Sequence, residues 1–184
     1  ATVQKGRLPS PSAEDEKDDE SAPYLTMEYL RGEIAMPPLL PKESSSLLAD
    51  DGDLLLLWDG SNAGEFLLAK RGIVSSTAAL VTPHEVYPNY FFWACKSLEK
   101  VVRAETVGMG IPHVNGEFLA NLHVPLPNTE QQQAIANYLD RETARIDALI
   151  AAKERLLKLL AEKRRALITH AVTRGLNTNV PLRD

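Results

Sequence analysis

The chain has 184 residues, of which 44% are hydrophobic, and this is enough to bury one sizeable core with an appended element. Its 25 acidic and 20 basic side chains give a net charge of −5, which argues against broad, unspecific binding to nucleic acid. No apolar run approaches the roughly 18 residues that a membrane-spanning helix requires, and no signal peptide is visible. The single cysteine, Cys95, lies among apolar residues and excludes an internal disulfide. We therefore expect a cytoplasmic protein without a membrane partner, with Cys95 in its core.

The first half of the chain indicates short strands separated by loops. An extended segment at 2–4 precedes a Pro-, Ser- and acid-rich stretch at 9–22, which predicts an irregular, mobile loop. A short strand is expected at 24–27, whereas Pro37, Pro38 and Pro41 predict irregular backbone before a β-hairpin region that follows 44–46. A turn signal at 51–52 precedes 53–58, a strand apolar on both faces and therefore central. Strands are also predicted at 65–70, 72–75 and 76–81, the first two joined by a hairpin turn.

Two capped helices and a proline-flanked strand are predicted next. Asn89 is the expected N-cap of a helix at 90–99, and a glycine-rich loop follows at 107–114. Asn115 is expected to cap a short helix at 117–121. Segment 123–127 indicates an edge strand, because its prolines cannot donate to a central ladder.

From Thr129 to about Thr173 the sequence predicts one long helix. Thr129 is the expected N-cap, with Gln132 at the spacing of a capping box, and Gly175 is the expected end. Acidic side chains early and basic ones late in this stretch suit the helix dipole. The predicted fold is therefore α+β: a mixed β-sheet globular domain at 1–128, followed by a long C-terminal helix of the antiparallel coiled-coil type and a tail at 129–184.

A stripe with alternating spacings of four and three residues runs along this helix. Its members are Ile135, Leu139, Glu142, Ile146, Leu149, Lys153, Leu156, Leu160, Lys163 and Leu167. A sustained period of about 3.5 residues is typical of a coiled-coil seam. A parallel pair of such helices would stack each of the three charged members on its own copy, whereas an antiparallel pair centred near Ala151 sets each opposite a leucine. The charges favour antiparallel pairing; a lone amphipathic surface helix is the alternative.

Common catalytic and cofactor motifs are absent from the sequence. There is no Walker A motif, dinucleotide-binding glycine fingerprint, His-Glu-x-x-His or Gly-x-Ser-x-Gly, and the four histidines lack metal-ligand spacing. The loop at 60–64, with a glycine at each end, could cradle a phosphate, although such loops more often close a turn. We therefore expect no catalytic activity, no cofactor and no metal.

Several segments occur in an order that is distinctive as a set. The most specific are 111–116 (Ile-Pro-His-Val-Asn-Gly), 122–127 (Leu-His-Val-Pro-Leu-Pro), 130–131 (Glu-Gln) and 135–140 (Ile-Ala-Asn-Tyr-Leu-Asp). Segments 141–147, 163–168 and 171–176, together with 23–25, 30–32 and 52–60, extend the match over nearly the whole chain. In these motifs the chain resembles the DNA specificity subunits of type I restriction–modification systems.

The resemblance implies a target recognition domain at 1–128 and a conserved-region helix at 129–173. A full subunit of the family carries two of each, with the helices antiparallel, and each domain reads one half of a split site on double-stranded DNA. Such a subunit is not an enzyme; it docks methyltransferase (modification) subunits and, through them, the restriction subunit. With one domain and one helix, this chain resembles a half-subunit or a fragment, pairing with a second half or with its own copy. A coiled-coil adaptor whose globular domain binds protein is the alternative function.

The candidate DNA contacts lie in the globular domain. They are Lys70, Arg71, Ser75, Ser76 and Thr77, with Asn62, His113 and Asn115 behind them. Lys70 and Arg71 form an isolated basic pair at a predicted turn, beside hydroxyls able to bond phosphates or bases. The alternative is that this pair simply solvates a hairpin.

Overall fold

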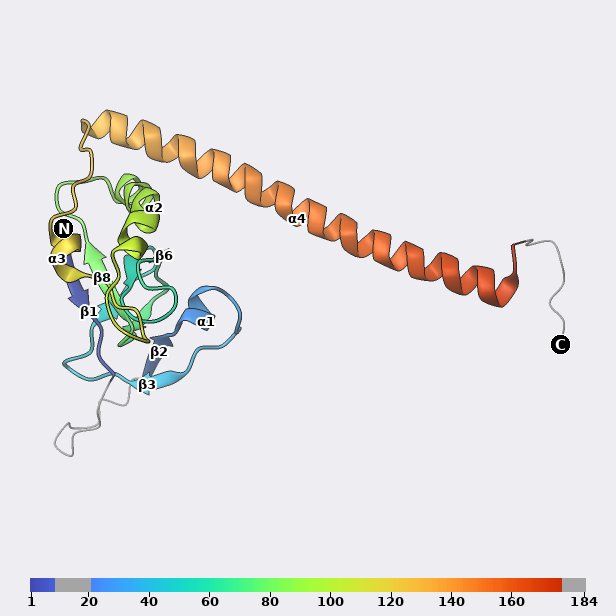
Figure 1. Cartoon of the computed structure of the whole chain (residues 1–184), viewed down its shortest axis with the longest axis horizontal. Helices are drawn as coiled ribbons and strands as arrows, with labels where there is room; N and C mark the ends of the chain where they lie inside the picture. The colour runs from blue at the N-terminus through green and yellow to red at the C-terminus, as the bar shows by residue number, and fades with distance from the viewer. Residues whose placement is uncertain (9–20, 177–184) are drawn as a thin grey trace. The chain divides into compact units, whose positions relative to one another are not determined.

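The computed structural model describes residues 1–8 and 21–176, so most of the predicted loop at 9–22 and the end of the tail lie outside the described residues (Figure 1). The chain divides into two compact units, Ala1–Ala136 and Asn137–Asp184. Among the described residues, the first unit holds the strands, three helices and the start of a long fourth helix, and the second unit holds the rest of that helix. The predicted α+β class is confirmed.

The first sheet is antiparallel throughout and has the order β1-β8-β5-β6. Its strands are β1 (Thr2–Lys5), β8 (Ala78–Thr82), β5 (Leu54–Leu57) and β6 (Phe66–Leu68). β5 pairs with both β6 and β8, and its four leucines are buried. The prediction of a central strand here, made from a run that is apolar on both faces, is confirmed.

The second sheet is mixed and has the order β3-β2-β7-β4. Its strands are β3 (Leu39–Pro41), β2 (Ser21–Leu25), β7 (Gly72–Val74) and β4 (Leu48–Ala49), with β2 and β7 parallel. Two predictions are wrong here. Pro41 lies in a strand, which is possible because β3 is at an edge and needs no second ladder. β6 and β7 belong to different sheets, so the connection through Lys70 and Arg71 is not a hairpin.

Three short or medium helices complete the globular unit: α1 (Met27–Leu30), α2 (Pro88–Ala104) and α3 (Gly116–Ala120). The predicted cap of α3 is confirmed, since Asn115 Oδ1 accepts from the Phe118 amide at 3.1 Å. The predicted cap of α2 is wrong: the helix begins two residues earlier than predicted, at Pro88, whose fixed φ suits a first helical position.

The predicted edge strand at 123–127 is also wrong. This segment has no strand pairing; instead, the Tyr90 hydroxyl donates to the Pro125 carbonyl at 2.8 Å. Leu122 and Val124 pack against the core. Side-chain packing on α2 therefore holds this segment in place of a ladder.

Two apolar clusters lie on opposite sides of β5. Leu54 and Leu56 belong to one cluster, with Phe66, Phe91 and Cys95 among its members. Leu55 belongs to the other, which also contains residues of β2, β4, β7 and β8. Because successive side chains of a strand point to opposite faces, this short run serves both cores.

The long helix, α4, spans Thr129–Arg174 and confirms the predicted element. Its cap differs from the prediction, because Asn128 and not Thr129 accepts, through Oδ1, from the Gln131 amide at 2.9 Å. The helix ends before Gly175, whose φ of +70° is the left-handed conformation expected there.

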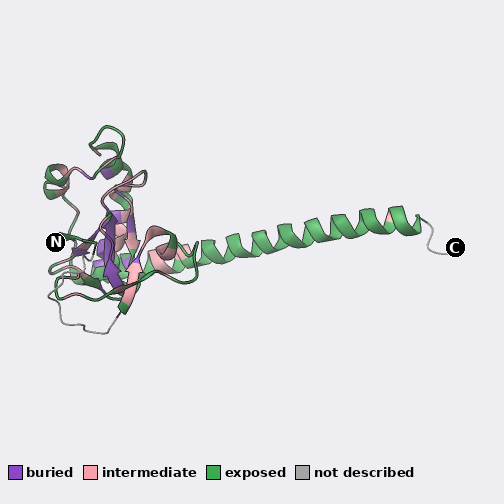
Figure 2. Ribbon diagram, turned by 90° about the horizontal axis from the view of Figure 1, so that it is seen from below, coloured by how far each residue is buried: buried purple, intermediate pink, exposed green. Residues whose placement is uncertain are grey.

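The first two turns of α4 belong to the globular unit. Buried Gln132 accepts from the Tyr87 amide through Oε1 at 2.8 Å and donates through Nε2 to the Pro127 carbonyl at 2.7 Å. Ala136 is fully buried. Beyond it the ribbon is exposed almost throughout (Figure 2).

The coiled-coil seam lies uncovered in this single chain. Six of its apolar members, from Ile135 to Leu167, keep 41–61% of their surface exposed. In proteins most of the stability of a helix comes from packing of its apolar face, so an uncovered apolar stripe of this length indicates an interaction surface.

Candidate nucleic-acid interface

The β7–β8 turn and the end of β5 form one polar surface. The Thr77 carbonyl accepts from the amides of Trp58 and Asp59, at 2.8 and 3.2 Å. Ser75 and Thr77 share a hydrogen bond between their hydroxyls at 3.2 Å. Three of the predicted contact residues, 75–77, therefore lie beside Asp59, which the sequence prediction did not include.

Asp59 is the centre of a three-residue ion cluster. Its Oδ2 lies 2.6 Å from Lys5 Nζ, and its Oδ1 lies 2.5 Å from His113 Nδ1. Burial by itself would raise the pKa of the Asp59 carboxyl, but the hydrogen bonds and positive charges of Lys5 and His113 outweigh it and hold the pKa below its usual value. The cluster joins β1, β5 and the 107–114 loop, and leaves Lys5 and His113 about half exposed.

Ser76 is held by a residue from the other sheet. The Tyr24 hydroxyl accepts from the Ser76 amide at 2.9 Å and donates to its Oγ at 3.4 Å. Ser75 is buried, whereas Thr77 is exposed. Of the three hydroxyl residues, Thr77 is the best placed to contact a ligand in solution.

The 107–114 loop is anchored beside this surface. Val107 and His113 exchange backbone hydrogen bonds at 2.9 and 2.7 Å, and the Pro112 carbonyl accepts from the Gly60 amide at 2.9 Å. His113, predicted as a contact residue, is thereby joined to the end of β5. We define this surface, formed by Lys5, Asp59, His113 and residues 75–77, as the polar surface.

Asn62 and Asn115 have structural partners. Asn62 Oδ1 accepts from Arg103 Nη2 at 3.2 Å, and Asn115 caps α3. Gly64 packs so closely on α2 that a Cβ there would lie 2.8 Å from Arg103 Cγ. The 60–64 loop therefore packs on a helix and closes a turn, which agrees with the interpretation preferred from the sequence.

The predicted basic pair lies at the opposite end of β5. Lys70 Nζ lies 4.1 Å from the centre of the Tyr29 ring and donates to the Tyr29 carbonyl at 3.3 Å. The Arg71 amide donates to Asp51 at 2.9 Å, and its guanidinium lies 3.7 Å from Asp50, with both of these side chains 84% exposed. The structure thus separates the predicted contacts into two zones and does not bring Lys70 and Arg71 to the polar surface.

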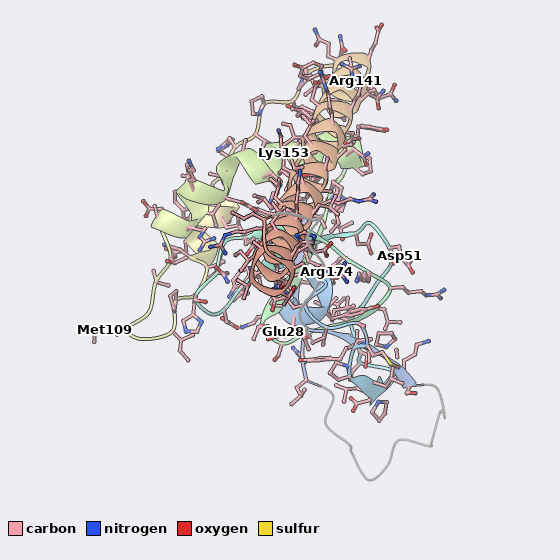
Figure 3. All side chains as sticks on the ribbon, turned by 90° about the vertical axis from the view of Figure 1, so that its right-hand side faces the viewer. Glu28, Asp51, Met109, Arg141, Lys153 and Arg174 are labelled. Atoms are coloured by element: carbon pink, nitrogen blue, oxygen red, sulfur yellow. The ribbon has the colours of Figure 1, made fainter. Side chains whose placement is uncertain are left out.

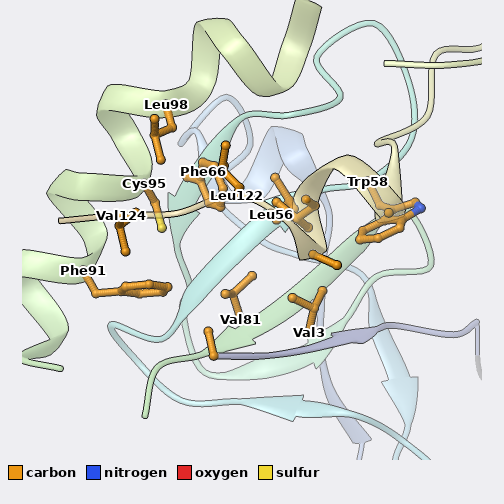
Figure 4. Close-up of a pocket in the computed structure, with 14 residues that line it drawn as sticks. Val3, Leu56, Trp58, Phe66, Val81, Phe91, Cys95, Leu98, Leu122 and Val124 are labelled. Carbon is orange, nitrogen blue, oxygen red and sulfur yellow. The ribbon is translucent and has the colours of Figure 1, made fainter. Parts of the chain in front are cut away.

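A cavity of about 460 Å³ lies elsewhere in the globular unit, between the first sheet, α2 and α3 (Figure 4). Its lining contains no charged side chain, and Val3, Leu56, Phe66 and Phe91 form much of its wall. Cys95 lies there as predicted, in the core, and burial raises the pKa of its thiol to about 12. Such a lining does not offer the donors that phosphates require, so this cavity is not part of the candidate interface.

In residues 1–8 and 21–176, no helix has both the length and the apolar character needed to cross a membrane. The same residues contain no group of three or more His, Cys, Asp or Glu side chains placed to hold a metal ion.

Removing the central carboxylate of the ion cluster should destabilise the fold in a pH-dependent way. We expect Asp59→Asn to lower the free energy of unfolding by about 1 kcal/mol at pH 7, because Lys5 and His113 lose their charged partner. Since the folded pKa of Asp59 lies below its ordinary value of 3.8, its contribution is fully present above that value and is lost as the pH falls through the folded pKa. Urea unfolding at pH 7 and at successive values below 4 measures this loss.

Asp50→Asn is the matched control, because Asp50 is a largely exposed carboxylate beside one arginine. It should change the unfolding free energy little at any pH. A difference between Asp59→Asn and the unaltered chain that stays constant down to pH 2 would contradict the assigned cause.

Comparison with known proteins gives a consistent result. The family model described as the type I restriction modification DNA specificity domain matches residues 1–159. The type I restriction enzyme MjaVIII specificity subunit of Methanocaldococcus jannaschii is 34% identical over 174 residues, which cover 94% of this chain and 40% of that protein.

Two solved structures share the fold. A chain of a type I R-M system superposes with a TM-score of 0.74 at 20% identity, covering 95% of this chain and 44% of that one. The HsdS subunit from Thermoanaerobacter tengcongensis superposes with a TM-score of 0.63 at 21% identity, covering 95% of this chain and 43% of that one. The chain thus spans less than half the length of each of these three proteins.

Proposed function

The chain belongs to the type I restriction–modification DNA specificity family, and we propose that its globular domain reads one half of a bipartite site on double-stranded DNA. In this proposal residues 1–128 are the target recognition domain and 129–184 are the conserved-region helix and tail. The protein is a non-catalytic specificity subunit, or half of one, acting in the cytoplasm. The observation that carries the proposal is the family match, which spans the whole globular unit and continues into α4.

The two zones described above are the proposed DNA contacts. The polar surface offers a lysine, a histidine and the exposed Thr77 hydroxyl, a set able to bond both phosphates and base edges. Lys70 and Arg71 offer two exposed cations, and we propose that they contact phosphates. We propose that Asn62 and Asn115 also contact DNA, through the side-chain atoms that their hydrogen bonds to Arg103 and Phe118 leave available.

Selection from a random duplex pool tests the function directly. The 184-residue chain is used by itself and together with a methyltransferase subunit, the partner that we propose for it, through which the restriction subunit would bind. Enrichment of a short motif, with affinity that falls as salt rises, is the expected result. If no motif is enriched even at low salt, the DNA-reading proposal is wrong and a coiled-coil adaptor that binds protein is favoured.

The basic pair should contribute to affinity in a salt-dependent way. We expect Lys70→Ala/Arg71→Ala to weaken binding to the selected duplex and to reduce the slope of log affinity against log salt by roughly one to two units. Lys100→Ala is the control, since Lys100 is exposed on α2 outside both zones. If the double variant keeps the affinity and salt slope of the unaltered chain, Lys70 and Arg71 do not contact DNA. The polar surface is then the one proposed contact zone.

The uncovered seam of α4 provides the second proposed contact. We propose that α4 packs antiparallel on the corresponding helix of a second half-subunit or, for this chain alone, on a second copy. In a pair centred near Ala151, Glu142 of one helix faces Leu160 of the other and lies within about one turn of that helix's Lys163. Exposed apolar side chains would thereby be covered without stacking like charges.

A further inference from the structure

The connection from α2 to α3 ends in an exposed apolar tip, formed by Val107, Met109 and Ile111. Met109 is completely exposed, and Val107 and Ile111 keep 50% and 61% of their surface exposed. Figure 3 shows Met109 at the outer end of its loop, pointing away from the rest of the unit. Because the Met109 side chain is fully exposed, it buries no apolar surface and does not contribute to the stability of the fold.

The base of this tip is fixed. Val107 and His113 close it through two backbone hydrogen bonds, and the Val114 amide donates to the Trp58 carbonyl at 2.9 Å. His113 is held from the side by the Asp59 carboxylate. The tip therefore projects from an anchored stem at the end of β5, and is not a slack surface loop.

Two glycines shape the turn that presents Met109. Gly108 and Gly110 have φ values of +115° and +107°, which other residues adopt only with strain. A Cβ at Gly108 would lie 2.6 Å from the Ile111 carbonyl oxygen, so the loop closes tightly there. At Gly110 such an atom would meet nothing within 4 Å, so the far side of the turn is open. The residues on both sides of Met109 therefore have no side chains, so the methionine side chain projects alone from the turn.

The surroundings of the tip favour nucleic acid over protein as its partner. The stem joins the polar surface, with Lys5 and His113 on either side of Asp59 and the Thr77 hydroxyl nearby. A protein-docking site would be expected to continue as an apolar patch, whereas this tip stands next to cations and hydroxyls. A small apolar group flanked by polar and basic side chains is the arrangement used to enter a DNA groove and separate stacked bases.

We propose that Met109 is a wedge that enters a groove of the bound duplex and partly unstacks one base step. The wedge rests on the proposed function, since it acts only if the globular domain binds DNA. Part of the recognition would then depend on how easily the sequence deforms, with flexible pyrimidine–purine steps preferred at the wedged position. No base-edge hydrogen bond is needed for this contribution to specificity.

The test uses the full 184-residue chain and the duplex selected above, with 2-aminopurine placed in turn at each step of the motif. We expect binding to raise 2-aminopurine fluorescence at one step, and end-to-end energy transfer to report a bend. Met109→Ala should abolish both signals and weaken binding about tenfold, since a methionine side chain is no longer buried. Its salt slope should be unchanged, because no charge is removed.

Two variants make the result specific. Met36→Ala replaces another methionine that is 82% exposed, in a separate loop, and should behave as the unaltered chain does. Met109→Leu should retain the fluorescence change, since leucine is also an apolar group of similar size. Thermal unfolding of Met109→Ala should match that of the unaltered chain, which excludes misfolding as the cause.

The outcomes separate the two proposals. If the unaltered chain binds no duplex, the proposed function fails and the wedge fails with it. If it binds with no fluorescence change, or if Met109→Ala binds and unstacks equally well, the function stands and the wedge is wrong. If Met109→Ala keeps full DNA binding but no longer binds the methyltransferase subunit, the tip is a protein-docking element and the wedge is again overturned.

Discussion

A dimer of the 184-residue chain is expected to dissociate when Leu156 is replaced by glutamate. In the proposed antiparallel pair Leu156 faces Ile146 of the other copy, and symmetry repeats this layer on the other side of the centre. The substitution therefore removes apolar burial at two places and leaves carboxylates in an apolar seam. At about 2 kcal/mol for each buried leucine, we expect the dissociation constant to rise by at least a hundredfold.

Sedimentation or light scattering over a range of concentrations measures this change. Arg155→Glu is the control, because Arg155 is exposed and lies outside the seam, and it should leave the dimer largely intact. If the unaltered chain is already monomeric at high concentration, the proposed self-pairing is wrong and α4 packs on a different partner.

The orientation of the pair is measured separately. A spin label at Arg141→Cys in a Cys95→Ala background should give two labelled backbones about 30 Å apart in the antiparallel dimer, being about ten residues from its centre on each side. A parallel dimer would place them roughly 10–15 Å apart, so a short distance would overturn the antiparallel arrangement.

The second large effect is expected at adjacent leucines of β5. We expect Leu55→Ala to lower the free energy of unfolding by about 3–5 kcal/mol, because Leu55 is fully enclosed in the second cluster. Leu56→Ala should cost less, about 2–3 kcal/mol, because Leu56 borders the 460 Å³ cavity and the part of its surface that faces the cavity has no packing to lose. Urea unfolding of both variants measures the difference, and the reverse order would show that the cavity is closed in solution.

What could be predicted from the sequence was local. The 3.5-residue spacing and the absence of Pro and Gly predicted α4, and the run 54–57 predicted a central strand, because each pattern lies within one element. The cap of α3 was predictable because Asn115 bonds an amide only three residues away. Family motifs, read in their order along the chain, extended this to the fold class.

What could not be predicted depends on residues that are distant in sequence. Lys5, Asp59 and His113 come from three separate parts of the chain, and no spacing rule joins them. Lys70 and Arg71 looked like a hairpin turn because nothing local shows that β6 and β7 enter different sheets. The prolines led to two opposite errors. Irregular backbone was predicted at Pro41, which lies in an edge strand, and an edge strand was predicted at 123–127, which has no strand pairing. A proline is tolerated in an edge strand, but its presence does not show that a strand forms.

The pairing of β1 with β8 affects how the chain folds during its synthesis. Thr2 lies opposite Thr82 and Lys5 opposite Ala79, so β1 cannot form its ladder with β8 until the residues as far as Thr82 have been made. At about 5–20 residues per second, β1 waits on the order of 4–16 s before its ladder can form. A waiting strand is a hazard for aggregation when it is apolar, but β1 reads Thr-Val-Gln-Lys, with one apolar residue and a terminal charge. The composition of this strand thus suits the delay that the topology imposes on the nascent chain.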